Sequence, residues 1–162
     1  MASGDTLCTF VPYQNEPPST NYATLGLRNF HPVLQFDDTV SESAVFTAIM
    51  PQNYSNATGV TVYVTGTAVA TSGTVGWTVE FERLDSLTDV DVDSFASAQT
   101  ITAGSVPATS GQTLTLSGAV TKGANIDSVV AGDLFRVRIK RDVANDNAIG
   151  DAELLGVEIR ES

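Results

Sequence analysis

The stretch VGWTVEFERL, residues 75–84, alternates apolar and polar side chains along its length. Because a β-strand sends successive side chains to opposite faces, this stretch predicts a strand with one apolar face and one acidic, solvated face. The acidic face carries Glu80 and Glu82. The apolar face carries Val75, Trp77, Val79 and Phe81. We expect this apolar face, with Trp77, to fill the core of the protein.

A second stretch, FRVRIKR at residues 135–141, shows the same alternation with the opposite charge. Its apolar positions hold Phe135, Val137 and Ile139, and its polar positions hold Arg136, Arg138 and Lys140. If the two stretches are neighbouring strands, their charged faces form a ladder of surface ion pairs. Such pairs contribute about 0.5 kcal/mol each and help to fix the strand register.

Further strand signals recur from residue 30 onward, with Thr and Val prominent and turn residues between them. The expected strands cover residues 33–36, 42–50, 60–67, 74–84, 99–102, 113–117, 134–141 and 154–160. This spacing predicts an all-β fold, a two-sheet antiparallel β-sandwich. We favour a jelly roll, and an immunoglobulin-like strand order is the alternative.

The first 29 residues differ from the rest of the chain, because they contain three of its prolines and no sustained period. They also hold several large apolar side chains, which a solvated tail would not carry. We therefore divide the chain into an extended N-terminal arm, residues 1–29, and a β-sandwich domain, residues 30–162. The arm is expected to pack on its own sandwich or on a neighbouring molecule.

Composition narrows the range of functions. The 162 residues carry a formal net charge of −11, with 42% hydrophobic and 17% charged residues. Such a chain has enough apolar residues to fold, and its charge argues against nucleic acid and against an anionic membrane as partners. The N-terminus has neither the basic nor the apolar region of a signal peptide, which favours synthesis in the cytoplasm. The single cysteine, Cys8, cannot form an intramolecular disulfide.

Residues that could support chemistry are few. Asp89, Asp91 and Asp93 alternate in an acidic loop that could hold Ca²⁺, although the spacing does not match an EF-hand and a solvated loop is the simpler interpretation. Glu80 and Glu82 would be about 7 Å apart on one strand, a separation that inverting glycosidases use, but the ion-pair ladder explains them better. His31, the single histidine, is expected in a turn or an interface. We expect no catalytic residue, no cofactor, no metal and no enzyme activity.

Four segments together resemble a group of small structural proteins of tailed bacteriophages. They are FDDTVSESAVFTAIMPQNY (36–54), VGWTVEFERLD (75–85), AGDLFRVRIKRD (131–142) and GDAELLGVEIRES (150–162). The resemblance covers the sandwich from about residue 34. It implies a β-sandwich displayed on a virion, and related phage coat jelly rolls suggest a homo-oligomer, a trimer.

On this basis we predict a capsid decoration (cement) protein on the capsid exterior, which binds the major capsid protein and stabilises capsomer junctions. The expected capsid contacts are the large apolar residues of the arm: Leu7, Phe10, Tyr13, Tyr22, Leu25 and Leu27. The alternative function is a tail-fibre or baseplate module that binds host-surface glycan. That alternative requires exposed aromatic residues near a loop cluster, for which Tyr22, Tyr54 and Tyr63 are the candidates.

Overall fold

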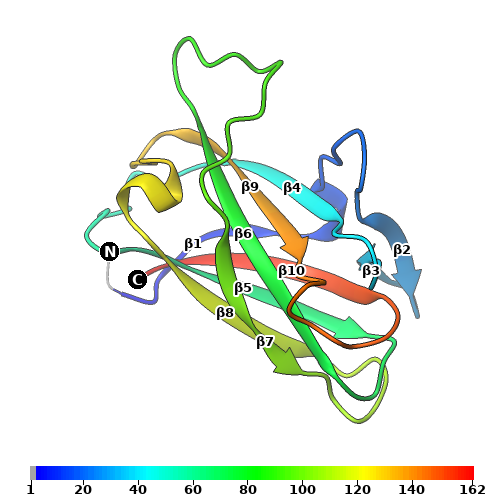
Figure 1. Cartoon of the computed structure of the whole chain (residues 1–162). Helices are drawn as coiled ribbons and strands as arrows, with labels where there is room; N and C mark the ends of the chain where they lie inside the picture. The colour runs from blue at the N-terminus through cyan, green and yellow to red at the C-terminus, as the bar shows by residue number, and fades with distance from the viewer. Residues whose placement is uncertain (1–2) are drawn as a thin grey trace.

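The computed structural model describes residues 3–162, which form two antiparallel β-sheets packed face to face (Figure 1). The ten strands are β1 (Thr6–Phe10), β2 (Thr24–Arg28), β3 (His31–Phe36), β4 (Ser43–Ile49), β5 (Gly59–Ala68), β6 (Thr74–Leu84), β7 (Gln99–Ser105), β8 (Leu114–Thr121), β9 (Leu134–Arg141) and β10 (Ala152–Glu161). Two short 3-10 helices, η1 (Pro12–Gln14) and η2 (Gly123–Ile126), lie between them. No helix in this part of the chain is long and apolar enough to cross a membrane.

The strand order confirms the predicted two-sheet sandwich. One sheet has the order β2-β3-β10-β5-β8, with β1 also paired to β10, and the other has the order β4-β9-β6-β7. From β3 to β10 the chain crosses repeatedly between the sheets, so strands distant in sequence become neighbours. This is the arrangement of a jelly roll, which joins two Greek keys, and it decides between the two topologies that the sequence left open.

The N-terminal segment belongs to the sheet. β1 pairs with β10 from Thr6↔Arg160 to Phe10↔Val157, and β2 pairs with β3. Within β1, Leu7 and Phe10 are buried, and the Phe10 ring lies 5.2 Å from that of Phe46. The boundary expected between residues 29 and 30 falls in the turn of the β2–β3 hairpin, so no linker separates the arm from the sandwich there.

The core lies between the two sheets and contains the apolar faces expected from residues 75–84 and 135–141. Trp77 is buried and meets Phe36 edge to face at 4.9 Å between ring centroids. Phe81 stacks on Phe135 at 5.8 Å, across the β6–β9 pair. Aromatic pairs of these geometries add about 1 kcal/mol each beyond the area that they bury.

The ladder of ion pairs is confirmed, because β6 and β9 are hydrogen-bonded neighbours with Glu80 opposite Arg138 and Glu82 opposite Arg136. Arg138 Nε lies 2.6 Å from Glu80 Oε2, and Arg136 Nη1 lies 2.7 Å from Glu82 Oε2. The expectation of a solvated acidic face is wrong, however, because Glu82 is 1% exposed. The β6–β7 loop returns over this face and covers the carboxylates.

Contacts of two residues, Ser94 and Phe95, hold the covering segment in place. Ser94 donates its backbone N–H to Glu82 at 2.6 Å and its hydroxyl at 3.1 Å. The guanidinium of Arg138 lies 4.0 Å from the ring centroid of Phe95, and that of Arg136 lies 5.0 Å away. The ladder is therefore a partly desolvated network in which carboxylates, cations and an aromatic ring stabilise one another.

A buried cation organises the loop between β9 and β10. Arg141 has no exposed surface and pairs with Asp146 at 2.9 Å. Its guanidinium also donates to the carbonyl oxygens of Phe36, Ala148 and Gly150. Alternation places Arg141 on the core side of β9, and these partners satisfy the charge that burial would otherwise penalise.

Candidate ligand-binding cleft

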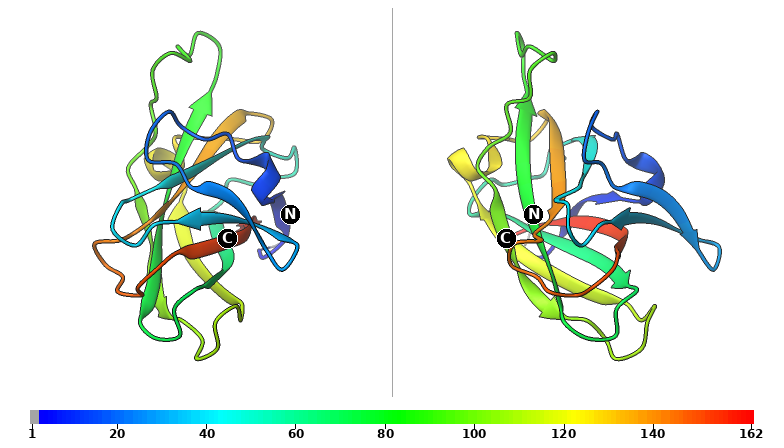
Figure 2. Two further views of the ribbon diagram at one scale, coloured as in Figure 1. Left: turned by 90° about the vertical axis from the view of Figure 1, so that its right-hand side faces the viewer. Right: turned by 45° about the vertical axis from the view of Figure 1, so that its right-hand side comes forward.

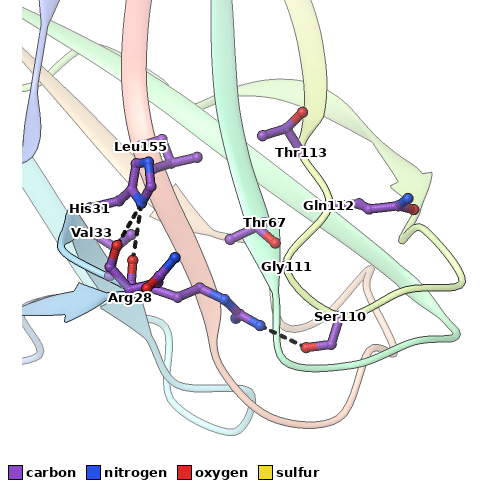
Figure 3. A pocket seen from close by; sticks show the side chains of 10 residues that line it. Arg28, His31, Val33, Thr67, Ser110, Gly111, Gln112, Thr113 and Leu155 are labelled. Carbon is purple, nitrogen blue, oxygen red and sulfur yellow. Dashed lines mark hydrogen bonds between the residues drawn. The ribbon is translucent and has the colours of Figure 1, made fainter.

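One hollow lies on the outer face of the first sheet, between the β2–β3 hairpin and the β7–β8 loop. Figure 2 shows the hairpin projecting from the body of the sandwich, and Figure 3 shows the side chains that line the hollow beside it. Its volume is about 400 Å³. One wall comes from Arg28, Asn29 and His31, and the other from residues 110–113. We call this hollow the cleft.

The hairpin that forms the first wall ends in a tight two-residue turn. Asn29 and Phe30 have φ angles of 44° and 67°, both in the left-handed region, and Arg28 pairs with His31 across the turn. This is the backbone of a type I′ turn, which matches the twist of the flanking strands. His31 Nδ1 lies 3.0 Å from the carbonyl oxygen of Asn29, so its N–H donates there and Nε2 stays available.

Arg28 connects the two walls. Its guanidinium pairs with Glu153 of β10 through Nη1, and Nη2 donates to Ser110 Oγ at 2.8 Å. Gly111 allows this approach, because a Cβ atom there would lie 3.0 Å from Arg28 Nη2, and its φ of 89° also favours glycine. The positive charge of Arg28 is balanced by Glu153, so the cleft is polar without a strong net charge of its own.

The floor of the cleft is mostly apolar. Val33 is fully buried, and Leu155 is half-buried beside it. Thr67 of β5 lies between the two walls (Figure 3) and is 7% exposed. Its Oγ1 is buried without a hydrogen-bond partner among residues 3–162. A buried hydroxyl without a partner is uncommon in folded proteins and indicates a group that a ligand or a water molecule would satisfy.

A second, smaller hollow of about 230 Å³ lies below the same hairpin, on the opposite face of β2. Tyr13 and Tyr22 line it and are exposed, as are Leu25 and Leu27 of β2. Three of the six expected contact residues, Tyr13, Tyr22 and Leu25, therefore line this hollow, Leu27 is exposed outside it, and Leu7 and Phe10 are buried in the core.

The other expected aromatic residues do not form an open platform. Tyr54 is buried, and burial raises the pKa of its hydroxyl to about 12. Tyr63 is half-buried under the guanidinium of Arg160, which lies 4.2 Å from the ring centroid. Among the three tyrosines proposed from the sequence, Tyr22 is the one with an exposed side chain beside a hollow.

The remaining candidate groups are engaged in structural contacts. Asp93 pairs with Arg136 at 2.9 Å, and residues 3–162 contain no group of three or more His, Cys, Asp or Glu side chains that could hold a metal ion. Glu80 and Glu82 accept hydrogen bonds from Arg138 and Arg136, so both carboxylates are engaged in the ion-pair ladder. Burial raises the pKa of the Cys8 thiol to about 11, so it is a poor nucleophile.

Sequence reasoning did not find the cleft, because the groups that line it come from β2, β3, β5, β10 and two separate connections. His31 was noted, but Arg28, Thr67 and Ser110 carry no motif. One local signal was available. The residues Arg28-Asn29-Phe30-His31 lie between two short alternating segments, with Asn29 at a position where type I′ turns favour asparagine.

Comparison with known proteins gives structural matches alone: no family model matches the chain, and no curated protein matches it. The carbohydrate-binding module CBM6cm-2 of Cellvibrio mixtus lichenase 5A, solved with cellotriose, matches over 98% of this chain and 99% of its own, with 12% identity and a TM-score of 0.42. The CBM22-1 xylan-binding domain of Paenibacillus barcinonensis Xyn10C matches over 99% and 96%, with 14% identity and a TM-score of 0.40.

A third match is the CBM22-1–GH10 portion of Clostridium thermocellum xylanase 10B, solved with xylohexaose. It covers 99% of this chain and 27% of that one, with 12% identity and a TM-score of 0.46. The three similar structures are, or contain, carbohydrate-binding modules. The class of fold, a jelly-roll β-sandwich, is defined by the strand order of this chain itself.

The prediction of a capsid decoration protein is corrected here. The similar structures are carbohydrate-binding modules, and nothing in the comparisons shows a phage protein. Burial of Leu7 and Phe10 also removes two of the six expected capsid contacts from the surface. The trimer, the capsid partner and the virion location are not tested by the structure or by the comparisons.

Proposed function

We propose that the cleft binds a neutral carbohydrate and that the protein acts as a glycan-binding module without catalysis. The polar groups around the cleft are hydroxyls, two amides, an imidazole and a guanidinium whose charge Glu153 balances. Hydroxyl-rich ligands need donors and acceptors of this kind rather than a strong electric field. The net charge of −11 disfavours phosphate esters and other anionic ligands.

The observation that carries the proposal is the buried, unpartnered hydroxyl of Thr67. Within residues 3–162, its Oγ1 is desolvated by folding and receives no hydrogen bond in return. Thr67 lines the cleft, so a sugar hydroxyl that reaches Oγ1 would either donate to it or accept from it and would recover part of the free energy lost by burial. The side chains of Asn29 and Thr113 also make no hydrogen bond within residues 3–162, so further polar groups remain available.

The shape of the cleft supports the same ligand class. Its volume of about 400 Å³ lies within the range of small-molecule sites, and its walls leave it open to solvent. Leu155, which is half-buried, gives the floor an apolar surface that suits the C–H face of a pyranose ring. The resemblance to phage structural proteins would place such a module on a tail fibre or baseplate, where it would bind host-surface glycan.

The test is to compare Thr67→Val with Thr65→Val. Valine keeps the shape of threonine and removes the hydroxyl. Thr65 lies two residues earlier on the same face of β5, outside the cleft, and its hydroxyl bonds to Thr115 at 2.8 Å. A glycan array identifies neutral sugars that bind the wild type, and isothermal titration then measures each variant.

We expect Thr67→Val to weaken sugar binding by about tenfold or more, because a site built to hydrogen-bond a hydroxyl then offers an apolar surface. Thr65→Val should bind as the wild type does. Absence of any array signal for the wild type would disprove the proposed function. Loss of binding in Tyr13→Ala or Tyr22→Ala, with Thr67→Val unaffected, would move the site to the hollow below the hairpin and disprove the assignment to the cleft.

A further inference from the structure

We propose that Phe30, at the tip of the β2–β3 hairpin, is a specificity-determining residue that stacks on a second sugar ring. The ligand class is then an oligosaccharide or polysaccharide chain rather than a single sugar. This inference rests on the proposed function, since it assigns a neighbouring subsite to the same cleft.

The first observation is the backbone of the turn. Phe30 has a φ of 67°, in the second central position of a two-residue hairpin turn. Glycine is strongly preferred there, because any side chain in the left-handed region crowds the backbone. For a bulky residue this conformation is a true outlier, and strained residues of this kind concentrate at functional sites.

The second observation is independent of the first. Phe30 is 91% exposed, so its ring gains almost nothing from packing within the protein. The chain therefore accepts both a strained backbone and an exposed aromatic ring at one position. Neither the strained backbone nor the exposed ring stabilises the fold. A contact of Phe30 with a molecule outside the described chain would account for both.

The position of Phe30 indicates what the contact is. Asn29 and His31, its two neighbours in the chain, both line the cleft, so Phe30 stands at the rim of the same wall. The hairpin tip projects away from the sandwich (Figure 2), which leaves the ring accessible to an extended ligand. The face of an aromatic ring packs well against the C–H face of a sugar, with little loss of side-chain entropy.

The experiment measures how chain length affects affinity in Phe30→Gly, with Phe30→Tyr and Leu27→Ala as controls. The probes are glucose, xylose, galactose and mannose, with the corresponding β-linked trisaccharides, measured by isothermal titration. Leu27 is exposed on the same hairpin and does not line the cleft, so it controls for a general loss of apolar surface.

We expect the wild type to bind a trisaccharide about tenfold more tightly than its monosaccharide. Phe30→Gly should bring the two affinities to within about threefold of each other and leave the monosaccharide affinity unchanged. Phe30→Tyr and Leu27→Ala should keep the wild-type ratio. Because glycine relieves the strain, the melting temperature of Phe30→Gly should equal or exceed that of the wild type.

Three results would overturn the inference, and they are distinguishable. If Phe30→Gly keeps the wild-type ratio, Phe30 contacts no second ring, while the proposed function stands. If it loses monosaccharide and trisaccharide affinity equally, the turn supports the cleft and makes no separate contact. If the wild type binds none of the probes or the arrayed glycans, the proposed function fails, and the inference fails with it.

Discussion

The outer faces of the two sheets use polar residues in opposite ways. On the β6–β9 face, Glu80 and Glu82 are paired with Arg136 and Arg138, and the returning β6–β7 loop covers them. On the face that holds the cleft, the Thr67 hydroxyl is buried without a partner among residues 3–162, and the hollow between the two walls is open to solvent.

The comparison separates structural polar groups from candidate functional ones. The charged ladder is the more conspicuous feature of the sequence, yet its charges satisfy one another and leave little for a ligand. The threonine is inconspicuous, yet its unsatisfied hydroxyl is the group that a ligand would complete. In this protein a missing partner is therefore a better guide to function than a cluster of charges.

The largest effect should come from breaking the ladder at its most buried member. Glu82→Ala removes a carboxylate that is 1% exposed and leaves Arg136 and the Ser94 N–H without it. We expect a loss of about 3 kcal/mol in the free energy of unfolding, measured by urea denaturation. The matched variant is Glu158→Ala, in the half-buried and uncovered pair with Arg160, which should cost less than about 1 kcal/mol. If the two substitutions lowered the free energy of unfolding equally, covering by the β6–β7 loop would not strengthen the ion pairs.

A smaller effect is expected at Arg28, because this residue both lines the cleft and forms an ion pair with Glu153. Arg28→Met leaves Glu153, which is buried, without its cation, and it breaks the link to Ser110. We expect a loss of about 2 kcal/mol in stability together with weaker sugar binding, measured by denaturation and titration. Arg28→Lys keeps the charge but not the two-sided geometry, so it should recover stability more fully than binding. If both properties changed in proportion, Arg28 would have no separate role in shaping the cleft.

The smallest effect on stability is expected at Asp151, whose carboxylate lies near other carboxylates. Desolvation, together with the nearby carboxylates Asp37, Glu153 and Asp38, raises the pKa of Asp151, and Arg141 opposes this shift. A raised pKa in the folded state means that the folded protein binds the proton more tightly, so the Asp151 charge costs stability as pH rises through that pKa. Asp151→Asn should therefore stabilise the protein at pH 7, by less than about 1 kcal/mol because solvent screens this partly exposed group.

The gain from Asp151→Asn should disappear below about pH 4, where the wild-type carboxyl is protonated in both states. Thermal unfolding of both proteins between pH 3 and pH 8 measures this dependence. A gain that stayed constant over this range would show that the amide acts by another route than removal of charge.

Much of the fold could be predicted because its signals are local. The alternation in residues 75–84 predicted which side chains enter the core. The opposite charges of Glu80 and Arg138 predicted an ion-pair ladder on the condition that β6 and β9 are neighbours, and the structure meets that condition. The role of the first 29 residues was harder to predict, since β1 has no strong period and its pairing with β10 joins the two ends of the chain. Solvation of the ladder was mispredicted for a similar reason, because Phe95 covers it from a loop with no regular pattern.

By itself, the sequence determined the strands from β3 onward and the apolar faces of β6 and β9, because a period of two is a property of adjacent residues. The tertiary structure alone decided where the cleft lies. Arg28, Thr67 and Ser110 meet only after β2, β5 and the β7–β8 loop have been brought together by contacts between distant parts of the chain. The absence of a partner for the Thr67 hydroxyl is likewise a property of the assembled surface, because it depends on every neighbour that folding places around that atom.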